Sequence, residues 1–234
     1  MSIRAEISDK NDGSVLVLRN SFPEGRREYE ILRPKCPRCY HPTESYGSGD
    51  CRTCRRWIAL QRAIALGVYI PTEYWDGAPP NDLSDDIFRA KNEEEMVYAN
   101  LLGVALSHYA LRLHSVLLEF DRVIPMPTAK SYNRERIMAS IVSQILDIKL
   151  LDNVLYKIPG RQMKGLSLSE RQENARKTIH AEGGKSLDGE TIIVVDDVLT
   201  AGCSLDRCSV ELQRIGAGKV VGLVAGRTYH PSTN

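Results

Sequence analysis

The segment that most constrains the fold is "TIIVVDDVLTAGCSL", in which four apolar residues (192–195) end in two adjacent aspartates and a loop of small residues. Apolar residues then recur at helical spacing until Gly216, and a second apolar run, "KVVGLVAG", follows. This order of strand, helix and strand predicts a βαβ unit in an open, mostly parallel α/β sheet flanked by helices. We expect Asp196 and Asp197 to lie at the carboxyl end of the first strand, where such sheets open onto a ligand crevice.

The loop after the two aspartates has the composition of a phosphate site. Gly202 and its small neighbours precede a helix, whose N–H groups and dipole can hold an anion. The residues that we expect around the phosphate are Thr200, Ala201, Gly202, Cys203 and Ser204. The loop lacks the lysine of G-x-x-x-x-G-K-[ST], and the chain has no G-x-G-x-x-G. A phosphate site beside paired carboxylates suits a ribose 5-phosphate, whose diol can donate to the carboxylates.

Four of the six cysteines form two C-x-x-C pairs, Cys36 with Cys39 and Cys51 with Cys54. Two such pairs in one short polar segment predict a closed structural zinc site of four thiolates. The alternative is unrelated thiols or two redox pairs, but redox C-x-x-C motifs occur singly at helix starts. The intervening residues are too polar to fold alone, so the metal would supply folding energy.

Basic residues are concentrated around these cysteines, although the net charge of the whole chain is only +1. Residues 33–62 contain seven basic and two acidic residues, with Tyr40, Tyr46 and Trp57 among them. Basic residues beside aromatic rings are typical of surfaces that contact single-stranded nucleic acid. One hypothesis is therefore contact through Arg52, Arg55, Arg56 and Trp57. The other is a solvated ribbon that docks on its own domain.

The rest of the chain is predicted to divide around a segment rich in proline and glycine, "IPTEYWDGAPPND". We expect an N-terminal extension (1–32), a four-cysteine zinc ribbon (33–62), a linker with a hood-like segment (63–91) and an α/β domain (92–234). Within that domain, periodicity predicts helices over 92–119 and 134–146, and "FDRVIP" is typical of a strand.

No apolar run follows the first basic residue at the N-terminus, so we expect no secretory signal. The most apolar long window is interrupted by His108, Arg112 and His114, which favours a core helix over a membrane span. We therefore expect no membrane span and a cytoplasmic location, where thiols stay reduced and bind metals.

The segment "VVDDVLTAGCS" resembles the signature of type I phosphoribosyltransferases, "VVDDVLTTG-T" in general form. More narrowly, the chain resembles the ComF family of competence-associated phosphoribosyltransferases over residues 36–228. The four-cysteine ribbon, "RVIPMPTAKSYNRER" and "KGLSLSERQENAR" carry this closer likeness. The resemblance implies a type I phosphoribosyltransferase fold in residues 92–234, preceded by a small zinc ribbon.

The resemblance also implies roles for particular residues. Asp196 and Asp197 would bind the hydroxyls of phosphoribosyl pyrophosphate, the loop 200–204 its 5-phosphate, and magnesium would bridge the diol and the pyrophosphate. The residues expected to face the pyrophosphate are Pro125, Met126 and Pro127, with Arg134 and Arg136 as cations. Residues 160–177 match a mobile lid, although a plain loop is the alternative. Because two like charges adjoin, we expect replacing both aspartates by asparagine to leave the fold at least as stable.

Two functions remain open at this point. One is transfer of a phosphoribosyl group to a nitrogenous acceptor that no residue identifies. The other is a non-catalytic protein of DNA uptake that senses phosphoribosyl pyrophosphate or a nucleotide. Single-stranded nucleic acid or a DNA-uptake helicase would then be its partner. The chain has "RERIMAS" where many relatives read "RERGFNQ", so it lacks a glycine, an aromatic ring and an amide side chain in this segment. Ala201, Cys203 and Ser204 also depart from the usual signature, at little cost if backbone amides bind the phosphate.

Overall fold

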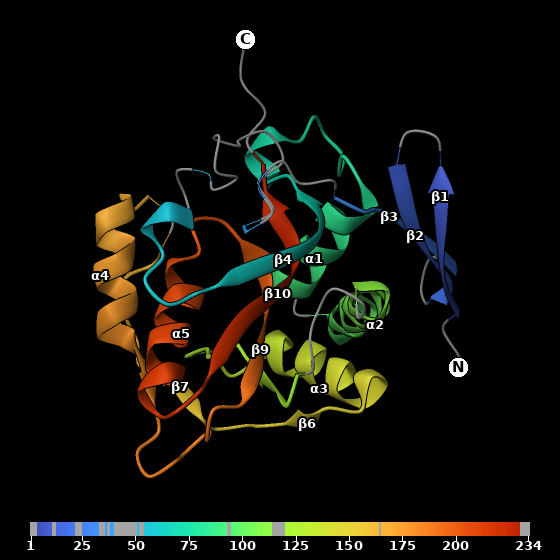
Figure 1. Cartoon of the computed structure of the whole chain (residues 1–234). Helices are drawn as coiled ribbons and strands as arrows, with labels where there is room; N and C mark the ends of the chain where they lie inside the picture. Colours follow the sequence, from blue (N-terminus) through green and yellow to red (C-terminus); the bar gives the residue numbers. More distant parts are fainter. Residues whose placement is uncertain are drawn as a thin grey trace.

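The computed structural model describes residues 4–10, 13–21, 25–32, 36, 38–39, 51, 54–92, 95–113, 120–163 and 165–229 (Figure 1). Its central element is a five-stranded sheet of order β4-β10-β9-β5-β6. Each neighbouring pair in this sheet is parallel. The strands are β4 (Arg62–Tyr69), β5 (Arg122–Pro125), β6 (Lys149–Leu150), β9 (Thr191–Leu199) and β10 (Lys219–Thr228).

Helices cover both faces of this sheet (Figure 1). One face carries α1 (Asp82–Asn92), α2 (Met96–Leu113) and α3 (Arg134–Leu146). The other carries α5 (Cys203–Arg214), on which α4 (Leu168–Thr178) packs. Because both faces are covered, the apolar run 192–195 of β9 is at most 1% exposed. The predicted βαβ unit is therefore present as β9, α5 and β10. None of the helices in the described ranges is long and apolar enough to cross a membrane.

Local signals explain where the helices begin and end. The side chain of Asn133 accepts a hydrogen bond from the N–H of Arg136 and caps α3, which ends at Asp147 with φ of 54°. Its bounds are the predicted 134–146. A capping box of Ser167 and Glu170 starts α4. The single helix predicted over 92–119 is instead the end of α1 followed by α2, and residues 114–119 lie outside the described part of the chain.

The segment predicted as a linker contributes a strand to the sheet, and this part of the prediction is corrected. β4 pairs in parallel with β10 along its length, from Arg62 opposite Val221 to Tyr69 opposite Thr228. The apolar residues 63–66 are at most 1% exposed. The turn signals begin only at Pro71, after this buried run, and lead through η2 (Thr72–Tyr74) into α1. The other domain boundaries stay predictions.

The N-terminal extension forms an antiparallel sheet of β1 (Arg4–Lys10), β2 (Gly13–Ser21) and β3 (Gly25–Glu30). It lies beside α1 and α2 (Figure 1) and is joined to α1 by buried polar contacts. The hydroxyl of Tyr29 donates to Asp86 Oδ2 at 2.5 Å, and Arg27 Nη2 lies 2.8 Å from Asp86 Oδ1. Burial raises the pKa of Asp86 to about 7, and the hydrogen bond from Tyr29 and the charge of Arg27 oppose that rise. The extension is thus part of the core.

Replacing Gly67 by alanine tests this packing of β3 and α1 on β4. A Cβ at Gly67 would lie 2.6 Å from Leu83 Cδ2 and 2.8 Å from the backbone oxygen of Glu30. A backbone carbonyl cannot move aside as a side-chain end can, so we expect Gly67→Ala to lower the free energy of unfolding by about 1 to 3 kcal/mol in urea denaturation. Gly183→Ala, with no atom within 4 Å, is the control and should change it by less than about 0.5 kcal/mol. Equal stability of the two variants would contradict the packing.

Candidate phosphate and metal sites

Three carboxylates converge at the end of β5, beside the point where β9 extends past it. Asp196 and Asp197 close the apolar run of β9, and Glu135 enters from the first turn of α3, which follows β5. Oxygen atoms of these three side chains lie within 4.8 Å of one another. The geometry follows from the topology, because parallel neighbours end at the same edge of a sheet. We call these three residues the carboxylate cluster.

Arg134 neutralises part of the carboxylate cluster. Its Nη2 lies 2.6 Å from Asp197 Oδ2 and 2.8 Å from Glu135 Oε1, and its Nε donates to Asp197 Oδ2 at 2.9 Å. Lys91 Nζ lies 4.0 Å from the same oxygen of Asp197. Arg134 and Asp197 are both buried, whereas Asp196 is partly exposed. The two aspartates therefore have different surroundings.

These surroundings move the two pKa values apart. Burial, with the nearby charges of Asp197 and Glu135, raises the pKa of Asp196 well above its usual range. Burial alone would raise the pKa of Asp197 too, but Arg134 and Lys91 outweigh it and lower that pKa. Burial and Asp197 also raise the pKa of Glu135. The cluster thus favours negative charge on Asp197 and disfavours it on Asp196 and Glu135, where a bound cation would offset it.

The donor set of the carboxylate cluster fits a magnesium ion. Magnesium prefers hard oxygen ligands, and a carboxylate cluster that lacks enough positive charge supplies them. Glu135 Oε2 is buried and has no hydrogen-bond partner among the described residues. Glu135 is not among the residues predicted from the sequence, although its place beside Arg134 at a predicted helix start could have indicated it.

The loop between β9 and α5 forms the second part of the site. Gly202 adopts φ of 76° and is the N-cap of the 12-residue helix α5, with no side-chain hydrogen bond at this cap. The first N–H groups of a helix lack partners within the helix, so an uncapped start favours an anion. A cavity of about 150 Å³ opens here. All five loop residues expected to bind phosphate line it, together with Asp196, Met163 and Arg171.

A second cavity, of about 400 Å³, adjoins the first and shares Met163, Arg171 and Thr200 with it. Its wall includes Asp197, Lys91 and part of the predicted hood, residues 69 and 71–73. The two aspartates thus face different cavities. Sequence analysis did not single out Lys91 or Met163, because nothing local indicates that α1 and the 160–177 segment meet at this edge.

The segment predicted as a lid provides Met163 and Arg171, which line both cavities. About half of it is α4, and its loop is tied to that helix. Asn174 Nδ2 donates to the backbone oxygen of Arg161 at 2.8 Å, and Arg171 Nε donates to that of Leu166 at 2.9 Å. Arg171 brings a guanidinium to the phosphate loop. That the segment 160–177 opens and closes stays a prediction.

Other predicted residues lie outside these two cavities. Arg136 is exposed and pairs with Asp152, its Nη2 2.9 Å from Asp152 Oδ2. Pro125 is the last residue of β5 and is followed by Met126 and Pro127, but none of the three lines either cavity. Met126 is buried, with its sulfur 3.6 Å from Cys208 Sγ. A role of these residues toward pyrophosphate stays a prediction.

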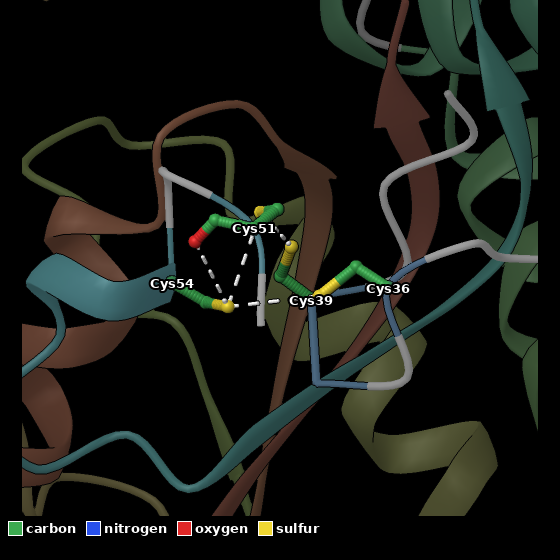
Figure 2. A group of neighbouring side chains, drawn as sticks. All are labelled: Cys36, Cys39, Cys51 and Cys54. Atoms are coloured by element: carbon green, nitrogen blue, oxygen red, sulfur yellow. Dashed lines mark hydrogen bonds between the residues drawn. The ribbon is translucent and has the colours of Figure 1, made fainter. Parts of the chain in front are cut away.

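The four cysteines of the predicted zinc ribbon converge, with their sulfur atoms turned toward one another (Figure 2). The Sγ atoms lie 3.6 Å apart for Cys36 and Cys54, 3.1 Å for Cys39 and Cys51, and 3.9 Å for Cys51 and Cys54. Tetrahedral zinc with Zn–S bonds of about 2.3 Å needs sulfur atoms about 3.8 Å apart, so the four can hold one ion. All four are fully buried. The other two cysteines lie elsewhere, Cys203 in the phosphate loop and Cys208 in the core.

Burial raises the pKa of the Cys54 thiol to about 12 and also raises the pKa of Cys39, whereas at Cys36 hydrogen bonds from the backbone of Cys39 and Cys51 outweigh burial and lower the pKa. A metal ion binds the thiolate form, so its binding would displace these protons.

One hypothesis about the ribbon is corrected. Trp57 was expected as a surface that stacks on bases, but its side chain is only 7% exposed, and its Nε1 donates to the backbone oxygen of Ala201 at 3.0 Å. The ring is covered because the ribbon docks on its own domain at the phosphate loop. Arg55 and Arg56 are exposed. Arg52 lies outside the described residues, as do Tyr40 and Tyr46.

The parallel sheet, the site at its carboxyl edge and the N-terminal cysteine cluster define the predicted class, a type I phosphoribosyltransferase fold with a small cysteine ribbon, and confirm that prediction. The chain is 23% identical over 219 residues to Competence protein F of Haemophilus influenzae. That match covers 89% of the chain and 91% of the relative, and it confirms the predicted resemblance to the ComF family. No family model matches the chain.

Two solved structures resemble part of the chain. A purine phosphoribosyltransferase from Pyrococcus horikoshii is 18% identical with a TM-score of 0.36, and the match covers 58% of this chain and 93% of that one. The UMP synthase of Leishmania donovani is 20% identical with a TM-score of 0.32, and the match covers 58% of this chain but only 23% of the synthase. The fold itself rests on the strand order and register of this chain.

Metal content tests the cysteine site. Protein purified without chelator should contain about one zinc ion per chain, because four buried thiolates complete a tetrahedral shell. Cys39→Ser should lose the metal, as measured by atomic absorption. Cys203→Ser is the matched control and should keep it, because this thiol lies outside the cluster. Zinc-free parent protein, or full zinc content in Cys39→Ser, would contradict the assignment.

The stability expected for aspartate variants also changes. From the sequence, replacing either aspartate by asparagine is expected to relieve the repulsion between the two carboxylates. The structure leaves this expectation for Asp196 alone, because Asp197 neutralises the buried Arg134. In thermal and urea unfolding near neutral pH, Asp196→Asn should be at least as stable as the parent. Asp197→Asn should be less stable by about 1.5 to 3 kcal/mol, since it weakens a charge-assisted hydrogen bond.

The pH dependence follows from the lowered pKa of Asp197. Its ionised form stabilises the fold above the unfolded-state pKa, and this contribution is lost as the pH falls through the folded-state pKa. The stability gap between parent and Asp197→Asn should therefore close on acidification. Two asparagine variants of equal stability at neutral pH would contradict the assigned role of Arg134.

Proposed function

We propose that the chain binds phosphoribosyl pyrophosphate with magnesium and transfers the phosphoribosyl group to a nitrogenous acceptor. The observation that supports this most is one cavity shared by Asp196 and the uncapped start of α5. A ligand with an anionic phosphate and a nearby diol would match both features at once. A ligand with a phosphate alone would give the carboxylate of Asp196 no role, and that carboxylate would repel the phosphate.

The phosphate of the ligand would bind the loop 200–204. The first N–H groups of α5 and the positive end of its dipole are the donors, and Arg171 adds a full positive charge at the cavity wall. Side-chain hydroxyls are less important in this arrangement. The hydroxyl of Thr200 already pairs with that of Thr228 at 2.8 Å. The departures at Ala201 and Cys203 therefore leave the backbone donors in place.

The diol would lie between the two cavities, because Asp196 faces one and Asp197 the other. Asp196 is the better diol acceptor, since Asp197 already accepts from Arg134. Asp196, Asp197 and Glu135 would hold magnesium, which when bound offsets the negative charge of the carboxylates and of the departing pyrophosphate.

In the transfer, the bond from C1 of the ribose to pyrophosphate oxygen would break, with its electron pair leaving on pyrophosphate. A bond from C1 to the acceptor nitrogen would form, and the proton of that nitrogen would pass to the departing pyrophosphate. Lys91 and Arg171 line the second cavity and can pair with the departing anion. The predicted hood lies on the same wall and would contact the acceptor. Residues 160–177 would exclude water from the reactive ribose carbon by covering both cavities.

Calorimetry with phosphoribosyl pyrophosphate tests the site. The parent should bind it in the presence of magnesium, and Arg171→Gln should weaken binding about ten- to a hundredfold by removing a charge-assisted contact. Arg176→Gln is the matched control on the same helix, because Arg176 is exposed and pairs with Glu173. It should bind like the parent. Absence of magnesium-dependent binding in the parent, or equal loss in both variants, would contradict the proposed site.

A second candidate function is non-catalytic ligand sensing during DNA uptake. It is favoured by the name of the relative, Competence protein F, and by the exposed Arg55 and Arg56 on the ribbon. Pyrophosphate release from phosphoribosyl pyrophosphate, measured with a panel of bases and single-stranded oligonucleotides, separates the two candidates. Release with any acceptor supports the enzyme. Binding of phosphoribosyl pyrophosphate without release of pyrophosphate supports the sensor, provided that the chain also binds oligonucleotides electrostatically. The log of the oligonucleotide affinity should then fall by about 0.7 per log unit of salt for each neutralised phosphate.

A further inference from the structure

The segment that leaves the cysteine cluster, residues 54–60, lies directly against the phosphate loop. It begins with η1 (Cys54–Arg56), and the N–H of Trp57 donates to the backbone oxygen of Cys54 at 3.1 Å. Trp57 then reaches the loop through its hydrogen bond to Ala201. A Cβ added at Gly202 would lie 2.6 Å from atoms of the indole ring. The ring therefore packs on the backbone that starts α5.

Asp206 fixes the same segment to the first turn of α5. Its Oδ1 accepts hydrogen bonds from the N–H groups of Ile58, Ala59 and Leu60, each at 2.9 Å. Asp206 is buried, so these charge-assisted bonds replace its contacts with water. One turn of helix thus holds the ribbon through a carboxylate and presents its N–H groups to the cavity. The ribbon and the phosphate loop share one rigid element.

Arg227 makes a second link, from β10. Its Nη1 donates to the backbone oxygens of Leu199, at 2.7 Å, and Thr200. Its guanidinium also interacts electrostatically with Cys39 and Cys51. Four thiolates around a zinc ion carry a net negative charge, which a buried guanidinium compensates. Metal at the cysteines would therefore stabilise Arg227 in the position from which it donates to the backbone oxygens of the loop.

Arg38, between the first two cysteines, completes the contact. Its guanidinium lies 5.7 Å from the centre of the Trp57 ring, and its Nη2 donates to the backbone oxygen of Leu60 at 2.9 Å. Both halves of the cysteine cluster are thus joined to residues that contact the phosphate loop. Loss of metal would free Cys54 and Arg38 together, and Trp57 would lose its fixed position.

We propose that the cysteine cluster positions the phosphate loop, so that metal at the four cysteines and a sugar phosphate at residues 199–204 bind cooperatively, with Trp57 as the positioning residue. The inference rests on the proposed function in taking this loop as the anion site. Cooperative binding is reciprocal, because each ligand changes the affinity of the other by the same factor. The sugar phosphate should therefore raise the affinity for the metal by the same factor by which the metal raises the affinity for the sugar phosphate.

The experiment uses the zinc-loaded full chain, ribose 5-phosphate as the probe, and two variants of adjacent residues. Trp57→Phe keeps a ring but removes the hydrogen-bond donor to Ala201. Ile58→Ala is the matched control, because its side chain is 85% exposed. Calorimetry gives the affinity for ribose 5-phosphate. A colorimetric chelator gives the rate of zinc release with and without saturating ribose 5-phosphate.

We expect Trp57→Phe to bind ribose 5-phosphate about three- to tenfold more weakly than the parent, the range for one lost hydrogen bond, and Ile58→Ala to bind it equally. Ribose 5-phosphate should slow zinc release from the parent and Ile58→Ala, and slow it less in Trp57→Phe. A purely structural contact would change stability without making zinc release depend on the sugar phosphate.

Equal affinity in the parent and Trp57→Phe would remove Trp57 as the positioning residue, and zinc release that ribose 5-phosphate leaves unchanged would remove the coupling between the two sites; either result would overturn the inference. Either result would leave the proposed function intact. A parent chain that does not bind ribose 5-phosphate would overturn the proposed function and the inference with it. If Trp57→Phe does not fold, the zinc-release measurement on the parent decides the question.

Discussion

The site depends on a shortage of positive charge where β9 extends past the end of β5. Glu135, Asp196 and Asp197 meet there, and Arg134 lies against two of them. Burial makes this charge costly, as the raised pKa values of Asp196 and Glu135 show. A protein gains no stability from such an arrangement. A cation with a diol ligand would satisfy it, and the neighbouring helix start would hold the phosphate of the same ligand.

The sequence predicted those parts of the fold whose signals are local. The apolar run of β9, the loop of small residues and the helical repeat of α5 follow one another in the chain, and α3 has an asparagine cap at its predicted start. β4 was assigned to a linker because its pairing with β10 joins residues more than 150 positions apart. No local pattern reports such a partner. The apolar residues 63–66 were also grouped with the proline and glycine residues that follow from Pro71, which indicate a linker.

The same limit applies to the site. Asp196, Asp197 and the loop 200–204 could be predicted because one short motif contains them. Glu135 and Lys91 could not, since only the folded sheet brings α1, α3 and β9 together. The composition around Trp57 predicted a ring exposed to nucleic acid, and docking of the ribbon buried it instead. Composition describes which contacts a segment can make, and tertiary structure decides which it does make.

Amide hydrogen exchange, with and without phosphoribosyl pyrophosphate and magnesium, tests the central claim most directly. The ligand should slow exchange in residues 199–205, where the loop starts α5, and also in residues 54–60 of the ribbon, because the two segments share hydrogen bonds. Residues Asn100 of α2 and Gln144 of α3, which line a separate cavity of about 570 Å³, should show no change in exchange. Protection confined to that cavity, or no protection of the loop, would contradict a phosphate site between β9 and α5.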